Sequence, residues 1–287
     1  MVTPEHRRTA VTLARQTAGI SERRACRFTG FARSSQRYRT RRSPDLALRT
    51  RLKELATKKP RWGYRQLTRV LRRQPGPRIN YKRVQRIYQQ EGLQVRRRRR
   101  KHRATVPRPP MPVPTGANER WSMDFVRDTL GDGRAFRSLT IVDDCTRESP
   151  AIEVDFSLPG ARVVAVLGRL KQTHGLPKAI VCDNGPEFAG AELDEWAYRN
   201  GVQLAFIDPG KPTQNAFIER FNGTFREECL NENWFVSLAD AQQTIEAWRV
   251  EYNTERPHSK LRDCTPREFA LNLTSTAVTT INPTGLT

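Results

Sequence analysis

Two stretches, AIVCDNGPEF at residues 179–188 and AFIERFNGTFREECL at residues 216–230, decide the fold and the chemistry predicted for this chain of 287 residues. The apolar run that opens the first stretch predicts a buried strand, and a turn-forming Asn-Gly-Pro ends it directly after Asp183. The second stretch predicts a helix that carries Glu219 beside a stripe of phenylalanines. Each carboxylate is therefore expected where a strand or a helix faces a cleft.

A third carboxylate, Asp124, lies in WSMDFV at residues 121–126, which also predicts a strand. Thirty-five residues separate Asp183 from Glu219. Mg²⁺ prefers oxygen ligands and keeps positions open for phosphate. Two such ions, about 3.5–4 Å apart, hold the attacking and leaving oxygens of a phosphodiester. The trio predicts a metal-dependent site, whereas a single acid such as Asp183 would more often be a solvated cap.

Positive charge is concentrated in the front of the chain, within an overall formal charge of +21. Residues 1–110 contain 33 Lys and Arg against 5 Asp and Glu, a net charge of +28, whereas residues 111–287 contain 18 against 25, a net charge of −7. A basic front is typical of a protein that binds a polyanion. The acidic rear argues against a ribosomal or membrane-surface binder and favours a metal-dependent catalytic part.

The five cysteines are far apart, form no CxxC pair, and do not combine with the four histidines into a ligand set. This spacing argues against a structural zinc site. Scattered cysteines, odd in number, are typical of reduced thiols in a cytoplasm. No signal peptide and no apolar run of membrane-spanning length is recognisable in the sequence. We therefore expect a cytoplasmic protein without a membrane partner.

Four motifs carry a resemblance to a known family: WSMDF, DNGPEF, NAFIERFNGTFREECL and YNTERPHSKL. They are similar to the OrfB-type transposases of the insertion-sequence-three family, relatives of the retroviral integrases, over nearly the whole chain. The resemblance implies a ribonuclease H-like α/β core and bacterial DNA as partner. It implies Asp124, Asp183 and Glu219 as the catalytic and metal-binding triad, with two Mg²⁺ ions per site and Mn²⁺ as a substitute.

The domain organisation is predicted from shifts in composition and from the resemblance. A proline-rich linker separates helical, arginine-rich segments from a part with alternating strands and helices. The predicted parts are a helix-turn-helix-like segment at 1–43, a second helix-turn-helix domain with a basic arm at 44–103, the linker at 104–117, the integrase catalytic core with its C-terminal helix at 118–275, and a flexible tail at 276–287.

The order of elements predicts an all-α front and a mixed five-stranded sheet covered by helices. Gly19 ends a first helix, Ser21 caps a second, and Ser34 or Ser35 caps a third at 36–41. Asn80 caps a later helix of the front. The predicted strands are 121–126, 135–142, 151–154, 178–182 and 202–207, with helices at 160–174, 191–200, around Glu219, and at 238–252.

The candidate DNA contacts are polar or basic side chains that the pattern or the resemblance leaves on the surface, and for each the alternative is a solvated surface residue. Arginine-rich runs bind phosphate. The candidates are Arg37 and Arg39 in the first segment; Lys82, Arg83 and Arg86 in the second; Arg96, Arg97, Arg98, Arg99 and Arg100 in the basic arm; and Lys211, Gln214, Asn215 and Arg220 around the Glu219 helix. Asn222 and Arg226 on that helix are weaker candidates.

Other polar and aromatic residues receive structural interpretations. Asp143 and Asp144 end a strand and are expected to cap or support it rather than to bind metal. Glu187 is a candidate for supporting the site from outside the metal ligands. His258 is expected to be structural or to contact DNA, because the predicted chemistry does not need an imidazole base. Trp62, with Tyr64, is expected to pack in a core.

The predicted function is a DNA transposase that cleaves and joins strands of an insertion sequence at its ends and at target DNA. We expect a homo-oligomer on DNA and either an upstream-frame OrfA protein or a fusion with it, in the nucleoid region of a bacterial cytoplasm. Two alternatives stay open. A plain metal-dependent nuclease of the same fold would cleave without joining, and a non-catalytic DNA-binding regulator would use the basic half alone.

Overall fold

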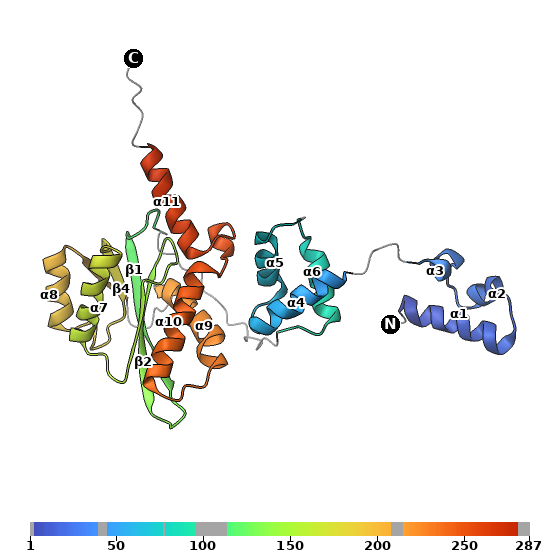
Figure 1. Cartoon of the computed structure of the whole chain (residues 1–287), viewed down its shortest axis with the longest axis horizontal. Coiled ribbons are helices and arrows are strands. Elements are labelled where there is room, and N and C mark those ends of the chain that lie inside the picture. Colours follow the sequence, from blue (N-terminus) through green and yellow to red (C-terminus); the bar gives the residue numbers. More distant parts are fainter. Residues whose placement is uncertain (1–2, 40–44, 77, 96–113, 208–214, 281–287) are drawn as a thin grey trace, which may run out of the picture. The chain divides into compact units, whose positions relative to one another are not determined.

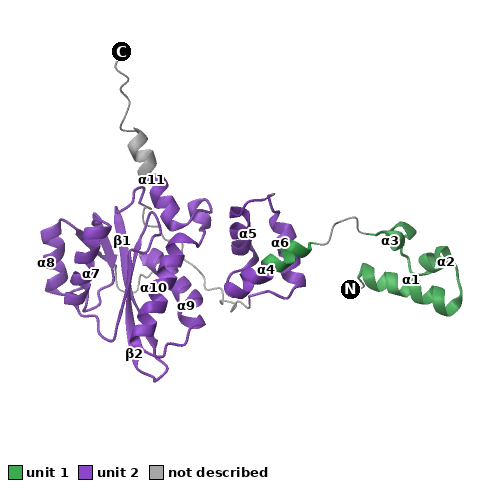
Figure 2. Ribbon diagram, viewed as in Figure 1, with its two compact units in different colours: residues 1–51 green, residues 52–287 purple. Residues whose placement is uncertain are grey.

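The computed structural model describes residues 3–39, 45–76, 78–95, 114–207 and 215–280, with side chains described as far as residue 273. The chain divides into two compact units, residues 1–51 and 52–287 (Figure 2). The boundaries predicted within the front, at the linker and at the tail stay predictions. Among the described helices, none has both the length and the apolar character needed to cross a bilayer.

The first unit is built from three short helices around a small core. Ser21 Oγ accepts the backbone N–H of Arg24, which confirms the predicted cap. Gly19 ends the first helix in the left-handed conformation that glycine adopts easily, with φ of 59°. Val11, Ala25 and Cys26 form the core. The helices are α1 (Pro4–Ala18), α2 (Glu22–Phe28) and α3 (Arg33–Arg37).

The third helix differs from its prediction. It begins at Arg33, with the extended Ala32 as N-cap, so both Ser34 and Ser35 lie inside it and neither caps it. Tyr38 is extended again, and the predicted helix at 36–41 is therefore wrong. Packing decides the start, because Phe31 rests on the small core and fixes the chain direction before the serines are reached.

The second unit opens with a helical block. Asn80 Oδ1 accepts the backbone N–H of Lys82 at 2.9 Å, as its predicted capping role requires. Val84, Ile87 and Tyr88 are buried, which confirms the predicted inward face of the last of these helices. The helices are α4 (Leu46–Lys58), which starts in the first unit, α5 (Tyr64–Arg73) and α6 (Tyr81–Gln90).

A mixed five-stranded sheet forms the centre of the rest of the second unit, in the order β3-β2-β1-β4-β5. The pairs β1–β2 and β2–β3 are antiparallel, whereas β1–β4 and β4–β5 are parallel. Every predicted strand is present, with ends shifted by up to three residues. The strands are β1 (Arg120–Thr129), β2 (Ala135–Asp143), β3 (Ala151–Asp155), β4 (Ala179–Cys182) and β5 (Gln203–Phe206).

Helices cover both faces of this sheet (Figure 1). On one face lie α7 (Gly160–Thr173) and α8 (Ala191–Asn200), and on the other α9 (Ala216–Glu228) and α10 (Leu238–Thr254). Each face buries its own apolar cluster. The predicted α/β architecture is confirmed. Two 3₁₀ turns, Leu230–Glu232 and Ser259–Leu261, and a last helix, α11 (Pro266–Thr280), complete the chain.

The alternation of side chains along β1 assigns its residues to these two faces. Trp121 and Met123 belong to the cluster under α7 and α8, whereas Val126 belongs to the cluster under α9 and α10. Successive residues of a strand point to opposite faces. Asp124 therefore faces α9, and Phe125 faces the α7–α8 side.

Within the second unit, Glu228 at the end of α9 collects donors from distant parts of the chain. Arg256 donates to both of its carboxylate oxygens, at 2.7 and 2.8 Å. The indole Nε1 of Trp62 donates to it at 3.1 Å. Trp62 is also 94% buried, which confirms its predicted packing role. The tryptophan therefore satisfies its one donor while its ring leaves water.

Candidate functional site

Asp124 lies in the middle of β1, and its carboxylate is held from two sides. Oδ1 accepts the backbone N–H of Phe125 at 2.7 Å, and Oδ2 accepts Nδ2 of Asn222 on α9 at 2.8 Å. Thr140, directly opposite Asp124 on β2, donates its hydroxyl to Oδ1 of Asn222 at 2.9 Å. The amide of Asn222 therefore bridges two strands and orients the carboxylate.

Asp183 follows directly after β4, the parallel neighbour of β1. Ser122 lies opposite Val181, so continuing the pairing by two residues brings Asp183 alongside Asp124. Asp183 Oδ1 accepts the backbone N–H of Gly185 at 3.0 Å. A Cβ on Gly185 would lie only 3.0 Å from that oxygen, so glycine leaves the carboxylate the room it needs.

Glu219 lies in the first turn of α9 and is exposed. The helix is anchored on its other side by Ile218, Phe221 and Phe225, all buried. The predicted face shared by Phe217 and Phe221 is only half right, because Phe217 is half-buried. Its ring instead lies under the guanidinium of Arg147, at 3.9 Å. The buried stripe keeps Glu219 on the open side of the helix.

The pKa of Asp124 responds to its burial and to the charges of the other two acids. Burial raises the pKa of Asp124, and the charges of Asp183 and Glu219 raise it further. The hydrogen bonds from the Phe125 backbone and from Asn222 oppose this rise. The pKa of Glu219 is also raised, by burial. Asp124 is therefore exposed to more negative charge than its surroundings stabilise, and the shared site of the trio stays a prediction.

This neighbourhood has the donor chemistry of a divalent-cation site, since it offers carboxylate oxygens from two strand positions and one helix. As placed in the described part of the chain, however, no three carboxylate, imidazole or thiol groups form a set that could hold a metal ion. Oxygens of Asp124 and Asp183 accept hydrogen bonds from the N–H groups of Phe125, Asn222 and Gly185. The residue types fit the metal, and binding would require these oxygens to turn toward it.

Asp143 and Asp144 have the structural roles predicted for them. Asp143 is buried and accepts three backbone N–H groups, those of Asn118, Cys145 and Thr146, at 2.7–2.8 Å. Asp144 is buried as well, and it accepts a hydrogen bond from Ser122 and pairs with the guanidinium of Arg120. Their oxygens are consumed by the protein at the end of β2.

Glu187 and His258 also lie outside the trio. Glu187 forms an ion pair with Arg137, and this bond holds the pKa of the glutamate below its usual range. Burial lowers the pKa of His258 to about 3, with nearby arginines adding to the effect. The imidazole is therefore neutral, and its ring packs edge-on against Tyr252 at 5.0 Å between centroids. This agrees with the structural role predicted for His258.

The candidate DNA contacts divide by location. Arg39, Lys82, Arg83 and Arg220 are exposed, Arg86 is half-buried, and Arg37 is exposed but pairs with Glu22 at 2.7 Å. The basic arm (Arg96 to Arg100) and the loop residues Lys211 and Gln214 lie outside the described residues.

The position of Asn215 differs from the prediction that it contacts DNA from the surface of a loop. It is 96% buried, and its Nδ2 donates to the backbone carbonyl of Met123 at 3.3 Å. The residue therefore joins the start of α9 to β1 next to Asp124, where it cannot reach a DNA backbone from the surface.

Sequence reasoning missed two residues near the trio. Thr140 interrupts the apolar run 139–142, and a polar residue inside a buried strand was a usable signal for a partner. Arg137 gave no such signal, because its contacts with Glu187 and Phe125 depend on cross-strand register. Asn222, expected as a weak DNA candidate, turns out to support Asp124.

Comparison with protein families places the geometry in context. An HTH-like domain matches residues 43–101, and two integrase core domain models match residues 114–212 and 200–266. The insertion element IS407 uncharacterized 31.7 kDa protein of Burkholderia multivorans is 48% identical over 266 residues, which cover 92% of this chain and 95% of that protein. The transposase InsD for insertion element IS2A/D/F/H/I/K of Escherichia coli is 28% identical over 249 residues, covering 80% of each.

Two solved structures align with the chain, and the first of them shares its fold. The integrase-containing intasome of simian T-cell lymphotropic virus, in complex with PP2A regulatory subunit B56 gamma, aligns with a TM-score of 0.51 and 16% identity, covering 76% of this chain and 74% of that one. The HTLV-2 integrase catalytic core domain in complex with magnesium aligns with a TM-score of 0.45 and 16% identity, covering 54% and 98%.

The relatives and the matched domains agree with the motifs, and with an α/β core of the integrase, ribonuclease H-like type that follows helical segments. DNA binding is implied by the HTH-like domain and by the family. The chain belongs to the OrfB-type transposases of the insertion-sequence-three family, with an HTH-like domain ahead of an integrase catalytic core of the DDE-type superfamily.

Proposed function

We propose that this transposase cleaves and transfers DNA strands of its insertion sequence, with Asp124, Asp183 and Glu219 as the catalytic carboxylates. The observation that carries the proposal is the electrostatic coupling of Asp124 to the other two acids beside the bridging amide of Asn222. These four side chains come from the middle of the central strand β1, from the residue after β4 and from helix α9.

The three carboxylates would hold two Mg²⁺ ions, or Mn²⁺ as a substitute. When bound, the cations supply Lewis-acid charge for the oxygens that enter and leave at phosphorus. Asn222 keeps the Asp124 carboxylate oriented, and Gly185 leaves space beside Asp183. Water as the nucleophile gives cleavage, and a DNA 3′-hydroxyl gives strand transfer. In both, one phosphorus–oxygen bond forms while another breaks, and the leaving 3′ oxygen takes the electron pair.

Glu219→Gln tests the assignment, because it keeps the size of the side chain and removes its charge. We expect strand cleavage with Mg²⁺ to be lost, measured with labelled element-end DNA by denaturing electrophoresis. Glu227→Gln, an exposed glutamate on the same helix, serves as the matched control and should cleave like the wild type. Cleavage near the wild-type rate in the Glu219 variant would remove Glu219 from the site.

The same DNA separates the two alternative functions. A plain nuclease would nick the labelled strand but would never join its 3′ end to target DNA. A non-catalytic regulator would bind equally well with or without Mg²⁺, and alanine at all three acids would leave its activity unchanged. Our proposal requires joined products that disappear with any one of the three carboxylates.

We also propose the assembly in which this chemistry takes place. The chain would act as a homo-oligomer on the two element ends and target DNA in a bacterial cytoplasm, together with an upstream-frame OrfA protein or as a fusion with it. The basic front, net +28, would hold the ends. Adding the OrfA protein to the cleavage reaction tests the partner, since the proposal expects more joined product in its presence.

A further inference from the structure

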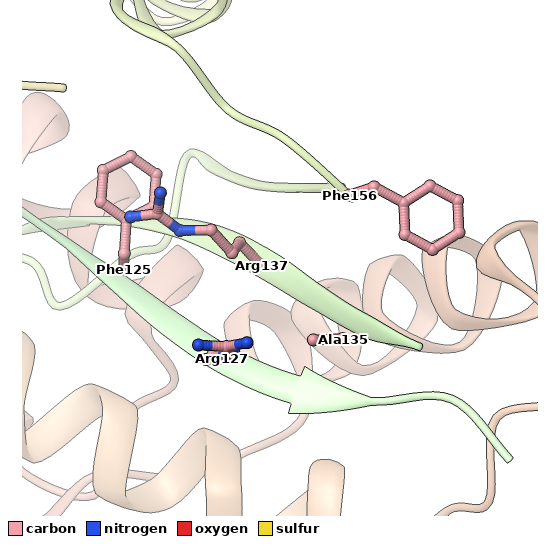
Figure 3. A pocket seen from close by; sticks show the side chains of 5 residues that line it. All are labelled: Phe125, Arg127, Ala135, Arg137 and Phe156. Carbon is pink, nitrogen blue, oxygen red and sulfur yellow. The ribbon is translucent and has the colours of Figure 1, made fainter. Parts of the chain in front are cut away.

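A hollow of about 490 Å³ lies on the sheet face opposite Asp124. Its lining comes from the two neighbouring strands β1 and β2 and from the residue that follows β3, and contains two arginines and two phenylalanines (Figure 3). The lining residues are Phe125, Arg127, Ala135, Arg137 and Phe156. The lining therefore combines flat rings with positive charge on a part of the chain that is acidic overall.

Flat groups are stacked in the hollow. The Arg137 guanidinium lies over the Phe125 ring at 4.2 Å, as Figure 3 shows, and the Phe125 and Phe188 rings are stacked with centroids 4.8 Å apart. The Phe125 ring, itself stacked on Phe188, therefore supports one face of the Arg137 guanidinium. At the other end, the guanidinium of Arg134 lies over the Phe156 ring at 3.9 Å. A held guanidinium plane is a surface on which a nucleobase can stack.

The charges at the hollow are not balanced. Arg127 and Arg137 stand directly opposite each other on β1 and β2, an arrangement of like charges that costs stability. Arg137 forms an ion pair with Glu187 and lies directly opposite Asp155 on β3. Arg127 is exposed, and its guanidinium pairs with no carboxylate of the described residues. The guanidinium groups of Arg127 and Arg134 thus remain available to an anion.

The residues of the hollow are close in sequence to the acids, although they lie on the other face of the sheet. Phe125 is the next residue after Asp124, and Glu187 and Phe188 belong to the segment that follows Asp183. Arg127 lies three residues beyond Asp124, a distance of about 10 Å at the rise of a strand. DNA rises about 3.4 Å per nucleotide along each strand, so this distance spans about three nucleotides. A DNA strand leaving the acids over the free edge of β1 would reach the hollow.

We propose that the hollow binds an unpaired nucleotide of the DNA strand about three positions from the reacting phosphate. Its base stacks on the open face of Arg137, and its phosphate pairs with Arg127. The inference rests on the proposed function for the identity of the strand, but it assigns a separate task to this surface. The hollow would hold a frayed DNA end open so that the reacting phosphate stays at the acids.

Two duplex probes with the same base pairs test this site in the full chain. One has a blunt end and the other a three-nucleotide single-stranded overhang, and Ca²⁺ replaces Mg²⁺ so that the strands stay intact. The ratio of the two affinities, from fluorescence anisotropy, cancels the shared contribution of the basic front. We expect the wild type to prefer the overhang at least about fivefold, the lower bound of what one stacked base contributes.

Two variants and a control make the test specific. Arg137→Lys keeps a cation for Glu187 but loses the flat plane, and Arg127→Ala removes a side chain that has no described acidic partner. Each should abolish most of the preference without lowering the thermal unfolding midpoint, and Arg127→Ala should raise the midpoint slightly because it removes the like charge opposite Arg137. Arg199→Ala, which removes an exposed arginine of α8 paired with Glu195, should leave the preference unchanged. Equal ratios in the wild type and both variants would overturn the proposal.

The outcome is separable from that of the proposed function. If the wild type prefers the overhang and both variants lose this preference, but the wild type does not cleave DNA with Mg²⁺, the proposed hollow is supported and the transposase chemistry is refuted. If the wild type cleaves and joins DNA but both variants keep the overhang preference, the transposase chemistry is supported and the proposed hollow is refuted. Overhangs carrying 5-iodo-deoxyuridine provide a second readout, because ultraviolet crosslinks should fall on peptides that contain Phe125 or Phe156.

Discussion

At Asp124 a half-buried carboxylate is under opposing influences. Burial and two neighbouring acids favour its neutral form, whereas the Phe125 backbone and the Asn222 amide favour the charged form. The net result is a raised pKa, so in the absence of a cation the ionised group costs folding free energy. A residue that destabilises its own fold is expected where function requires it.

The Asp124→Asn variant should therefore unfold at a higher temperature than the wild type at pH 7 in metal-free buffer. Because the folded-state pKa is raised, the wild type bears the full penalty above that pKa and none of it below about 3.9, the ordinary value. The gain should shrink as the pH falls toward 4. Calorimetry between pH 4 and pH 7 in EDTA measures it, and a variant that unfolds earlier than the wild type at pH 7 would contradict the argument.

The second prediction for a single residue concerns Asn222. Asn222→Ala removes the donor to Asp124 Oδ2 and leaves the carboxylate free to rotate. Groups that orient a metal ligand typically contribute about 10–100-fold in activity or metal affinity. We expect cleavage to slow by about that factor and to need more Mg²⁺. Rates measured across a Mg²⁺ titration check this, with Thr224→Ala on the same helix as control, since that hydroxyl bonds only to the Arg220 carbonyl among the described groups.

Among the helices and strands, α9 connects Glu219 to the apolar core. Its exposed side carries Glu219 and Arg220, while Phe221 and Phe225 pack against Trp248 of α10 with centroids 5.7 and 5.1 Å apart. The four-residue spacing of the phenylalanines gives one apolar face, and α10 supplies the surface that buries it. The position of Glu219 thus depends on packing on the opposite side of its helix.

Phe225→Ala should lower the free energy of unfolding by about 3–5 kcal/mol, because a fully buried aromatic ring is lost and a cavity remains. Urea denaturation measures the change. Glu227→Ala, two residues further on and exposed, is the matched control and should change stability by less than about 0.5 kcal/mol. A loss below about 1 kcal/mol for Phe225→Ala would mean that α9 is held by other contacts.

For the whole molecule, the separation of charge is the dominant feature. A net charge of +28 in residues 1–110 precedes a net charge of −7 in residues 111–287. Phosphate contacts by the front release counterions, so affinity for DNA should depend steeply on salt. The acidic core would be repelled by the same DNA, which makes local basic surfaces such as the hollow around Arg137 valuable for its approach.

We expect the affinity of the full chain for duplex DNA to fall about a thousandfold between 50 and 200 mM salt, as about six or more phosphate contacts would require. Anisotropy titrations across this range give the slope of log affinity against log salt, predicted to be about −5 or steeper. The three-alanine variant of the acids should show a similar slope, because the contacts lie elsewhere. A slope shallower than about −2 would remove the basic front as the main DNA-binding surface.

The left-handed backbone at Arg262 and Asp263, with φ of 56° and 64°, shows what sequence patterns do not reveal. Residues other than glycine adopt this conformation uncommonly, although aspartate does so more often than arginine. Tertiary contacts accompany it, since Asp263 pairs with Arg69 of α5 and its backbone N–H donates to the His258 carbonyl. The conformation of this turn follows from partners far away in the chain.

By itself, the sequence determined the sheet and most helices, because periodicity, caps and turn residues are local signals. It predicted Gly19, Ser21 and Asn80 as helix boundaries for the same reason. Only the tertiary structure decided that Asn215 is buried and that α3 begins at Arg33. Cross-strand register and packing are non-local. The hydrogen-bond bridge of Asn222 and the stacked side chains of the hollow could therefore be seen only in the folded sheet.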